Sequence, residues 1–161
     1  MKDHFKLLGW TVVAEILSLF IALTLASELA VMRVVCAVCT VGILLALTAQ
    51  GGHSAAVADH RAHRETGVLR PIFLGITAVL PHLLLWGMLM AARYEILPDD
   101  SYRLYKLLDA PFLPVCTLLS TGVSTASVPT AGLFVLLALS LLPFPAVVIA
   151  YCMTKKARAM T

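Results

Sequence analysis

The chain consists of four long, almost uncharged apolar stretches that are separated by short polar connectors. These stretches cover residues 7–27, 31–49, 71–92 and 130–153. A helix of about 20 apolar residues is long enough to cross a hydrocarbon core of about 30 Å. The pattern therefore predicts an all-α integral membrane protein, a four-transmembrane-helix bundle surrounded by the lipid bilayer.

The overall composition supports the same class. Of the 161 residues, 60% are hydrophobic and 13% are charged, and the mean hydropathy is +0.93. Because the connectors are too short for a separate soluble domain, we expect one membrane domain over residues 1–161. The first stretch follows Lys2 and Lys6 as a secretory signal would. However, it is longer than a usual signal core and contains Glu15, so we expect a retained helix.

Lysine and arginine residues divide unevenly between the two predicted membrane sides. The two tails and the connector 51–70 hold eight of the twelve, whereas the other connectors hold four. Segments rich in Lys and Arg stay in the cytoplasm. Both termini and residues 51–70 are therefore predicted to be cytoplasmic, and residues 93–129 to lie outside. The net charge of +3 is distributed by membrane side in this way, so no nucleic-acid partner is expected. Short connectors favour a bacterial cytoplasmic membrane.

The predicted inner connector is polar and rich in histidine. Gln50, Gly51 and Gly52 are typical of a helix stop, and residues 54–65 predict a short separate helix before Pro71. The connector contains His53, His60 and His63, which are interleaved with arginines. Positive charges beside these imidazoles are unfavourable for a bound cation, so no metal or other cofactor is predicted there. Its arginines suit anionic lipid headgroups, and the candidates are Arg61, Arg64 and Arg70.

The predicted outer segment, residues 99–122, is expected to be partly embedded. Ser101 is typical of a helix start, and the Tyr, Leu and basic residues of 102–108 suit a helix at the membrane surface. Residues 110–122 are apolar but too short to span, which favours an interfacial or re-entrant piece. The alternative, a full span, would move the basic C-terminal tail outside.

Prolines also mark two of the predicted spans. Pro81 removes one hydrogen bond from the third span and predicts a kink there. Pro143 and Pro145 predict an interrupted fourth span. Interrupted helices build ion and substrate sites in transporters, and they also occur where neighbouring helices satisfy the freed backbone groups.

Two ionisable side chains lie deep inside predicted spans. Glu15 is about 12 Å into the first span and His82 about 16 Å into the third, measured from the same side at 1.5 Å per residue. Ionisable groups at such depth are costly and usually face the bundle interior. We expect Glu15 and His82 to meet if the two spans are neighbours. Such a pair would either relay a proton or hold a cation, or form a structural hydrogen bond that locks two helices.

Cys36 and Cys39 form a Cys-x-x-Cys motif near the predicted outer end of the second span. Cysteines at this spacing can cycle between dithiol and disulfide. The motif and the helix count resemble the four-helix membrane oxidoreductases that re-oxidise periplasmic disulfide catalysts, and more loosely the vitamin K epoxide reductases. The resemblance implies a second outer pair, but the outer region holds only Cys116, and Cys152 lies near the inner end. We expect Cys36 and Cys39 to be reduced and packed as small apolar residues.

The sequence leaves three functions open. The leading interpretation is a subunit, accessory factor or homo-oligomer that acts through helix packing rather than as an enzyme, with other membrane-protein subunits or copies of itself as partners. The first span carries small residues at every fourth position, which places them on one face of the helix: Ala14, Ser18, Ala22 and Ala26. Small residues let membrane helices approach closely, so this stripe favours a packing face. The alternatives are a small transporter or channel unit that uses Glu15 and His82, and a thiol–disulfide oxidoreductase that uses Cys36 and Cys39.

Overall fold

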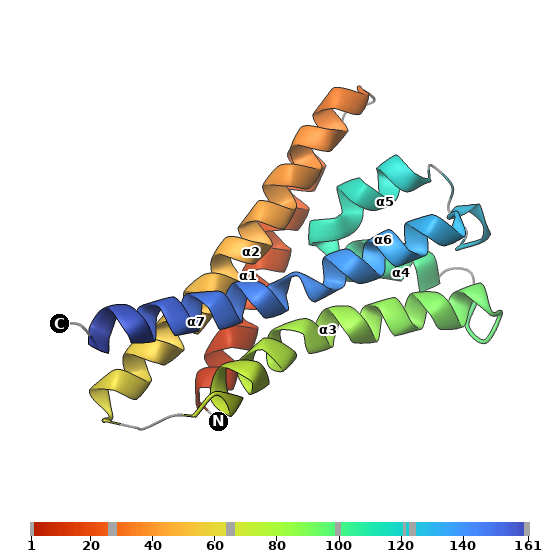
Figure 1. Ribbon diagram of the computed structural model, residues 1–161. Coiled ribbons are helices and arrows are strands. Elements are labelled where there is room, and N and C mark those ends of the chain that lie inside the picture. Colours follow the sequence, from red (N-terminus) through yellow and green to blue (C-terminus); the bar gives the residue numbers. More distant parts are fainter. Residues whose placement is uncertain are drawn as a thin grey trace.

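The computed structural model describes residues 2–25, 29–63, 67–98, 101–120, 122 and 125–159, and this described part is helical without strands. Its elements follow the chain in this order (Figure 1): α1 (Lys2–Thr24), α2 (Ala30–Arg61), α3 (Leu69–Arg93), α4 (Ser101–Leu108), η1 (Ala110–Phe112), α5 (Leu113–Leu119), η2 (Thr125–Ser127), α6 (Thr130–Leu141) and α7 (Pro143–Ala159).

Four helical segments are long and apolar enough to cross a membrane. They are α1, α2, α3 and the consecutive pair α6–α7, as the four apolar stretches predict. Their outward faces carry large apolar side chains that lie more than half exposed, which suits contact with lipid better than contact with water. Examples are Phe5, Phe20, Val38, Phe73, Leu84 and Phe134.

These four candidate membrane helices, called spans below, form two pairs that lie together at one end and diverge at the other (Figure 1). Helix α2 packs along α1 and α7, and α3 packs along α7 and α6. Both described chain ends and the connection from α2 to α3 lie at the same end, which we call the terminal end. At the opposite end, which we call the open end, α4 and α5 lie between the diverging spans, with α4 against α3 and α5 against α2 and α6.

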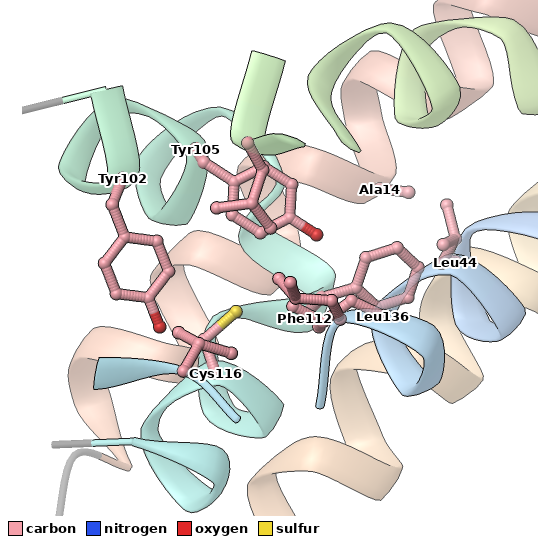
Figure 2. Close-up of a cluster of buried hydrophobic side chains, with 10 residues drawn as sticks. Ala14, Leu44, Tyr102, Tyr105, Phe112, Cys116 and Leu136 are labelled. Carbon is pink, nitrogen blue, oxygen red and sulfur yellow. The ribbon is translucent and has the colours of Figure 1, made fainter. Parts of the chain in front are cut away.

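The segment that was predicted to be partly embedded is part of the core. Figure 2 shows Tyr102, Tyr105, Phe112 and Cys116 of this segment gathered against Leu136 of α6. All five are almost completely buried. The two tyrosines of helix α4 point inward, while Leu104, Leu107 and Leu108 are exposed on its other face. A second cluster of buried residues fills the terminal half: Leu7, Ala55, Ala56, Leu74, Ala78, Val147 and Tyr151.

The helix stop predicted at Gly51 and Gly52 is wrong, because α2 continues without a break to Arg61. The two glycines are sites of close helix contact instead. A Cβ atom on Gly52 would lie 2.5 Å from the carbonyl oxygen of Val147 on α7, and one on Gly51 would collide with the Leu7 side chain of α1. Small residues that admit a neighbouring backbone are typical of membrane helix contacts. The separate polar helix predicted over 54–65 is the last part of α2.

The predicted interruption of the fourth span is confirmed. Helix α6 ends at Leu141 and α7 begins at Pro143, so the change of helix falls at Leu142. Pro143 and Pro145 have no backbone N–H to continue the ladder of α6. By contrast, α3 runs through Pro81 as one helix, Leu69–Arg93.

Candidate functional site

Glu15 of α1 and His82 of α3 lie side by side inside the bundle. The Oε1 atom of Glu15 is 3.7 Å from Nδ1 of His82. The His82 side chain is fully buried, and the Glu15 side chain is 21% exposed. Their similar depth in neighbouring spans, which is visible in the sequence, is what brings them together.

Asp109 is a third member of this group that the sequence analysis missed. Its side chain is fully buried, and its Oδ1 atom lies 2.8 Å from Nδ1 of His82, a hydrogen-bonding distance. The next residue, Ala110, donates its backbone N–H to Oε2 of Glu15 at 2.9 Å. The turn between α4 and η1 therefore brings one acid into the bundle and fixes the other. We call Glu15, His82 and Asp109 the acid–histidine cluster.

Neighbouring groups hold the turn and the imidazole in place. Thr40 of α2 donates its hydroxyl to the carbonyl oxygen of Pro111 at 2.8 Å, and Ser18 of α1 contacts the Thr40 carbonyl at 3.4 Å. The ring of Phe112 lies 5.6 Å from the His82 ring, centroid to centroid. The cluster thus sits where α1, α2, α3 and η1 meet.

If both of its acids were ionised, the cluster would carry more negative than positive charge. Within the described residues, neither Glu15 nor Asp109 pairs with a lysine or arginine. Two ionised carboxylates would exceed one imidazolium even if His82 were protonated. Such an imbalance is costly in a medium of low polarity. A proton or another cation shared by the cluster removes that cost.

Several polar atoms around the cluster have no hydrogen-bond partner, although they are buried. They include Nε2 of His82, Oδ2 of Asp109 and the hydroxyl groups of Tyr102 and Tyr105. Buried polar groups in native proteins are nearly always partnered. Nδ1 of His82 lies against Asp109, so Nε2 is the open position of the ring.

The cluster also has the donor atoms of a small-cation site. One ligand atom from each of the three residues lies within 4.8 Å of the other two. Carboxylate oxygens with one imidazole nitrogen suit a proton or a divalent metal ion of intermediate softness. The geometry therefore allows both proton exchange among the three residues and cation binding between them.

A line of protonated polar groups continues from Asp109 toward the open end. Burial raises the pKa of the Tyr105 hydroxyl, and the Asp109 carboxylate beside it adds to the effect. Burial likewise raises the pKa of the Tyr102 hydroxyl, which points toward Cys116 in Figure 2. The pKa of the Cys116 thiol is raised to about 12, first by burial and then by Asp109. These groups keep their hydrogens at neutral pH.

A second, partly buried polar network lies at the terminal end, and its two carboxylates share one arginine. Arg70 of α3 forms ion pairs with Asp3 of α1, at 2.6 Å, and with Asp59 of α2. Tyr151 of α7 donates its hydroxyl to Asp59 at 2.9 Å. The network joins all four spans and was not predicted from the sequence. Arg70, one of the predicted lipid-headgroup residues, has its guanidinium held by these two carboxylates. Arg61 is exposed, and Arg64 lies outside the described residues.

The remaining candidate residues are dispersed. The four cysteines are unpaired, and Cys36 and Cys39 face in different directions, because Cys36 is buried and Cys39 is exposed. Cys39 is therefore not packed as expected. His53 lies 2.8 Å from the Thr154 hydroxyl of α7. On the small-residue stripe, Ala14, Ser18 and Ala22 are buried in α1, whereas Ala26 lies outside the described residues.

One signal in the sequence could have pointed to Asp109. It directly precedes Ala110, Pro111 and Phe112, at the start of an apolar piece that is too short to span. An acidic residue next to such an embedded piece loses contact with water, as one within a span does, and its burial has the same energetic cost. Because Asp109 lies outside the four predicted spans, the depth of ionisable residues within those spans does not reveal it.

No protein-family model, curated protein or solved structure matches the chain.

Proposed function

We propose that the protein is a small membrane transport unit that passes protons through its helix bundle by way of Glu15, His82 and Asp109. The observation that carries this proposal is the composition of the acid–histidine cluster: two carboxyl groups and one imidazole lie together inside the bundle without a lysine or arginine partner among the described residues. Intramembrane ionisable residues of this kind are typical of proton relays and ion pathways.

The spacing of the three groups supports proton exchange. His82 lies 2.8 Å from Asp109 and 3.7 Å from Glu15, so one imidazole nitrogen is close to both carboxyl groups. Because Nε2 of His82 has no partner, the ring can take up a proton on one side and release one on the other.

Polar groups on both sides of the cluster suit a pathway. Tyr105 and Tyr102 continue it toward the open end, and their hydroxyls have no hydrogen-bond partner. Toward the terminal end, the buried hydroxyls of Thr11 and Thr48 lie on the inner faces of α1 and α2. The network around Arg70 closes that end in this conformation, so passage requires this network to open.

The competing function is an accessory subunit or homo-oligomer in which the cluster only joins helices. The bonds from η1 to α1 and α2 favour it, because they fix the embedded segment in the bundle. However, if the cluster only joined helices, a second carboxylate without a cationic partner would not add to the stability of the fold. Removal of that charge should then leave stability unchanged or raise it.

Proteoliposomes distinguish the two functions. Wild-type protein is reconstituted with a pH-sensitive dye inside the vesicles, and a potassium diffusion potential drives proton entry. The wild type should acidify the interior faster than protein-free vesicles. Glu15→Gln keeps an oxygen that accepts the Ala110 N–H but removes the titratable group, so proton entry should fall to the protein-free rate. Glu95→Gln, an exposed acid at the end of α3, serves as the matched control and should keep the wild-type rate.

The proposal fails if wild-type vesicles acidify no faster than protein-free vesicles. It also fails if Glu15→Gln and Asp109→Asn conduct like the wild type. Either result would favour the accessory subunit or homo-oligomer. The unfolding midpoint of each variant in detergent is measured in parallel, so that a loss of proton entry is not mistaken for a loss of folded protein.

A further inference from the structure

A cavity of about 390 Å³ opens between the spans at the open end. It lies between the last turn of α1, the first turns of α2 and the helices α4 and α5. Its walls are mostly apolar and include Leu23, Leu25, Leu113 and Pro114. The volume falls within the range of about 300–1,000 Å³ that is usual for ligand sites. The acid–histidine cluster does not line it.

Two basic side chains, Arg33 and Lys106, also line this cavity. Both are half-buried, and they come from different elements, α2 and α4. Among the described residues that line it, none is acidic. Two cations in a mostly apolar wall favour a ligand that carries an anionic group and an apolar body.

Lys106 is held in position at the cavity. Its Nζ atom donates to the backbone carbonyl of Gly122 at 3.0 Å and lies 4.2 Å above the ring of Tyr102. Burial lowers the pKa of this ammonium group, which shows that its charge is incompletely solvated. An ammonium group has three donors, and the carbonyl takes one of them. An anion beside Lys106 would restore the lost solvation.

We propose that this cavity binds a phospholipid with an anionic headgroup, with the phosphate at Arg33 and Lys106 and one acyl chain along Leu23, Leu25 and Leu113. The position favours a lipid over other amphiphilic anions, because the cavity opens at one end of helices long enough to span a membrane. Basic pockets between membrane helices bind anionic lipid headgroups. This inference is independent of proton transfer through the acid–histidine cluster.

The proposed lipid site differs from the one that the sequence predicts. Arg61, Arg64 and Arg70 lie at the predicted inner side, whereas Arg33 and Lys106 belong to the opposite end. The sequence separates the two cavity cations by more than 70 positions. Only the folding of α4 and α5 between the diverging spans brings them to one cavity.

The test uses the full chain in a non-ionic detergent with two lipids that share the same oleoyl chains. Dioleoylphosphatidylglycerol is anionic, and dioleoylphosphatidylcholine is zwitterionic. At about 100 times its dissociation constant, the anionic lipid should raise the unfolding midpoint by about 5–10 °C. The zwitterionic lipid should give less than half of that shift. Glycerol 3-phosphate, which has the phosphate but no acyl chain, should give none.

Variants locate the effect. The double variant Arg33→Gln/Lys106→Gln should lose the shift caused by the anionic lipid, whereas Arg103→Gln, which removes a basic side chain from the exposed face of α4, should keep it. If the double variant does not fold, Thr117→Trp fills the cavity without changing its charge and should also lose the shift. Equal shifts from both lipids, a full shift from glycerol 3-phosphate, or a shift that survives the variants would each overturn the proposal.

Discussion

Single side chains in this bundle carry buried charge in two different ways. At the terminal end, Arg70 lies between Asp3 and Asp59, so the acids are paired and further bonded by Tyr151. In the acid–histidine cluster, Glu15 and Asp109 share one imidazole. Removal of an acid that pairs with an arginine leaves an uncompensated charge and should destabilise the fold, whereas removal of an acid without a lysine or arginine partner should not. Mutations in the two groups should therefore have different effects.

The first prediction concerns Tyr151, whose hydroxyl donates to Asp59 at 2.9 Å in a buried position. Tyr151→Phe keeps the ring but removes this bond to a charged acceptor, so the free energy of unfolding should fall by about 1.5 kcal/mol. Tyr94→Phe is the control, because Tyr94 is 71% exposed, and its unfolding midpoint should not change. Thermal unfolding in detergent measures both. An unchanged midpoint in Tyr151→Phe would show that the network contributes little.

The second prediction concerns the thiols. Cys36 is buried and Cys39 is exposed, and both are unpaired, so neither should form a disulfide in native membranes. Protein extracted into denaturant should therefore bind the same amount of maleimide with and without prior reduction. Cys36→Ser and Cys39→Ser should each lower that amount equally under both conditions. A gain in labelling that needs reduction and disappears in both variants would restore the oxidoreductase interpretation.

At the scale of helices, the spans could be predicted from the sequence because a membrane core demands a long apolar run in each. The change of helix at Leu142 was also predictable, since prolines act locally. The end of α2 was not, because Gly51 and Gly52 signal a helix stop locally but serve as contact points for Leu7 and Val147 in the bundle.

The candidate site was predictable to the same limited degree. The depths of Glu15 and His82 depend only on helix rise. Asp109 reaches them through a turn between α4 and η1, and the position of that turn depends on tertiary contacts such as the bond from Thr40 to Pro111. Contacts between residues 71 positions apart leave no local pattern in one sequence.

The third prediction tests the contact between α2 and α7. Gly52→Ala places a methyl group 2.5 Å from the Val147 carbonyl oxygen, so the helices must separate, at a cost of about 1–3 kcal/mol in the free energy of unfolding. Gly42→Ala on the same helix meets no atom within 4 Å. It should leave stability unchanged or raise it by up to about 1 kcal/mol, because alanine favours the helix. Equal unfolding midpoints for both variants would contradict this packing.

At the scale of the whole molecule, the two ends have different characters. The terminal end is closed by the network around Arg70, which joins all four spans. At the open end, the spans diverge around α4 and α5 and leave the cavity beside Lys106. The proposed lipid site and the proposed proton pathway would both be reached from this end. Which membrane side it faces therefore decides where each would operate.

The last prediction sets this orientation. Both chain ends and the connection between α2 and α3 lie at the terminal end, and the segments there hold eight of the twelve lysines and arginines. Because basic segments stay in the cytoplasm, reporter fusions after Thr66 and at Thr161 should report the cytoplasm, and one after Asp100 the outside. The reverse pattern at all three sites would invert the bundle, and the lipid site would then face the cytoplasmic leaflet. An outside signal at Thr161 alone would contradict the four-span arrangement, because an even number of spans returns the chain to the side on which it began.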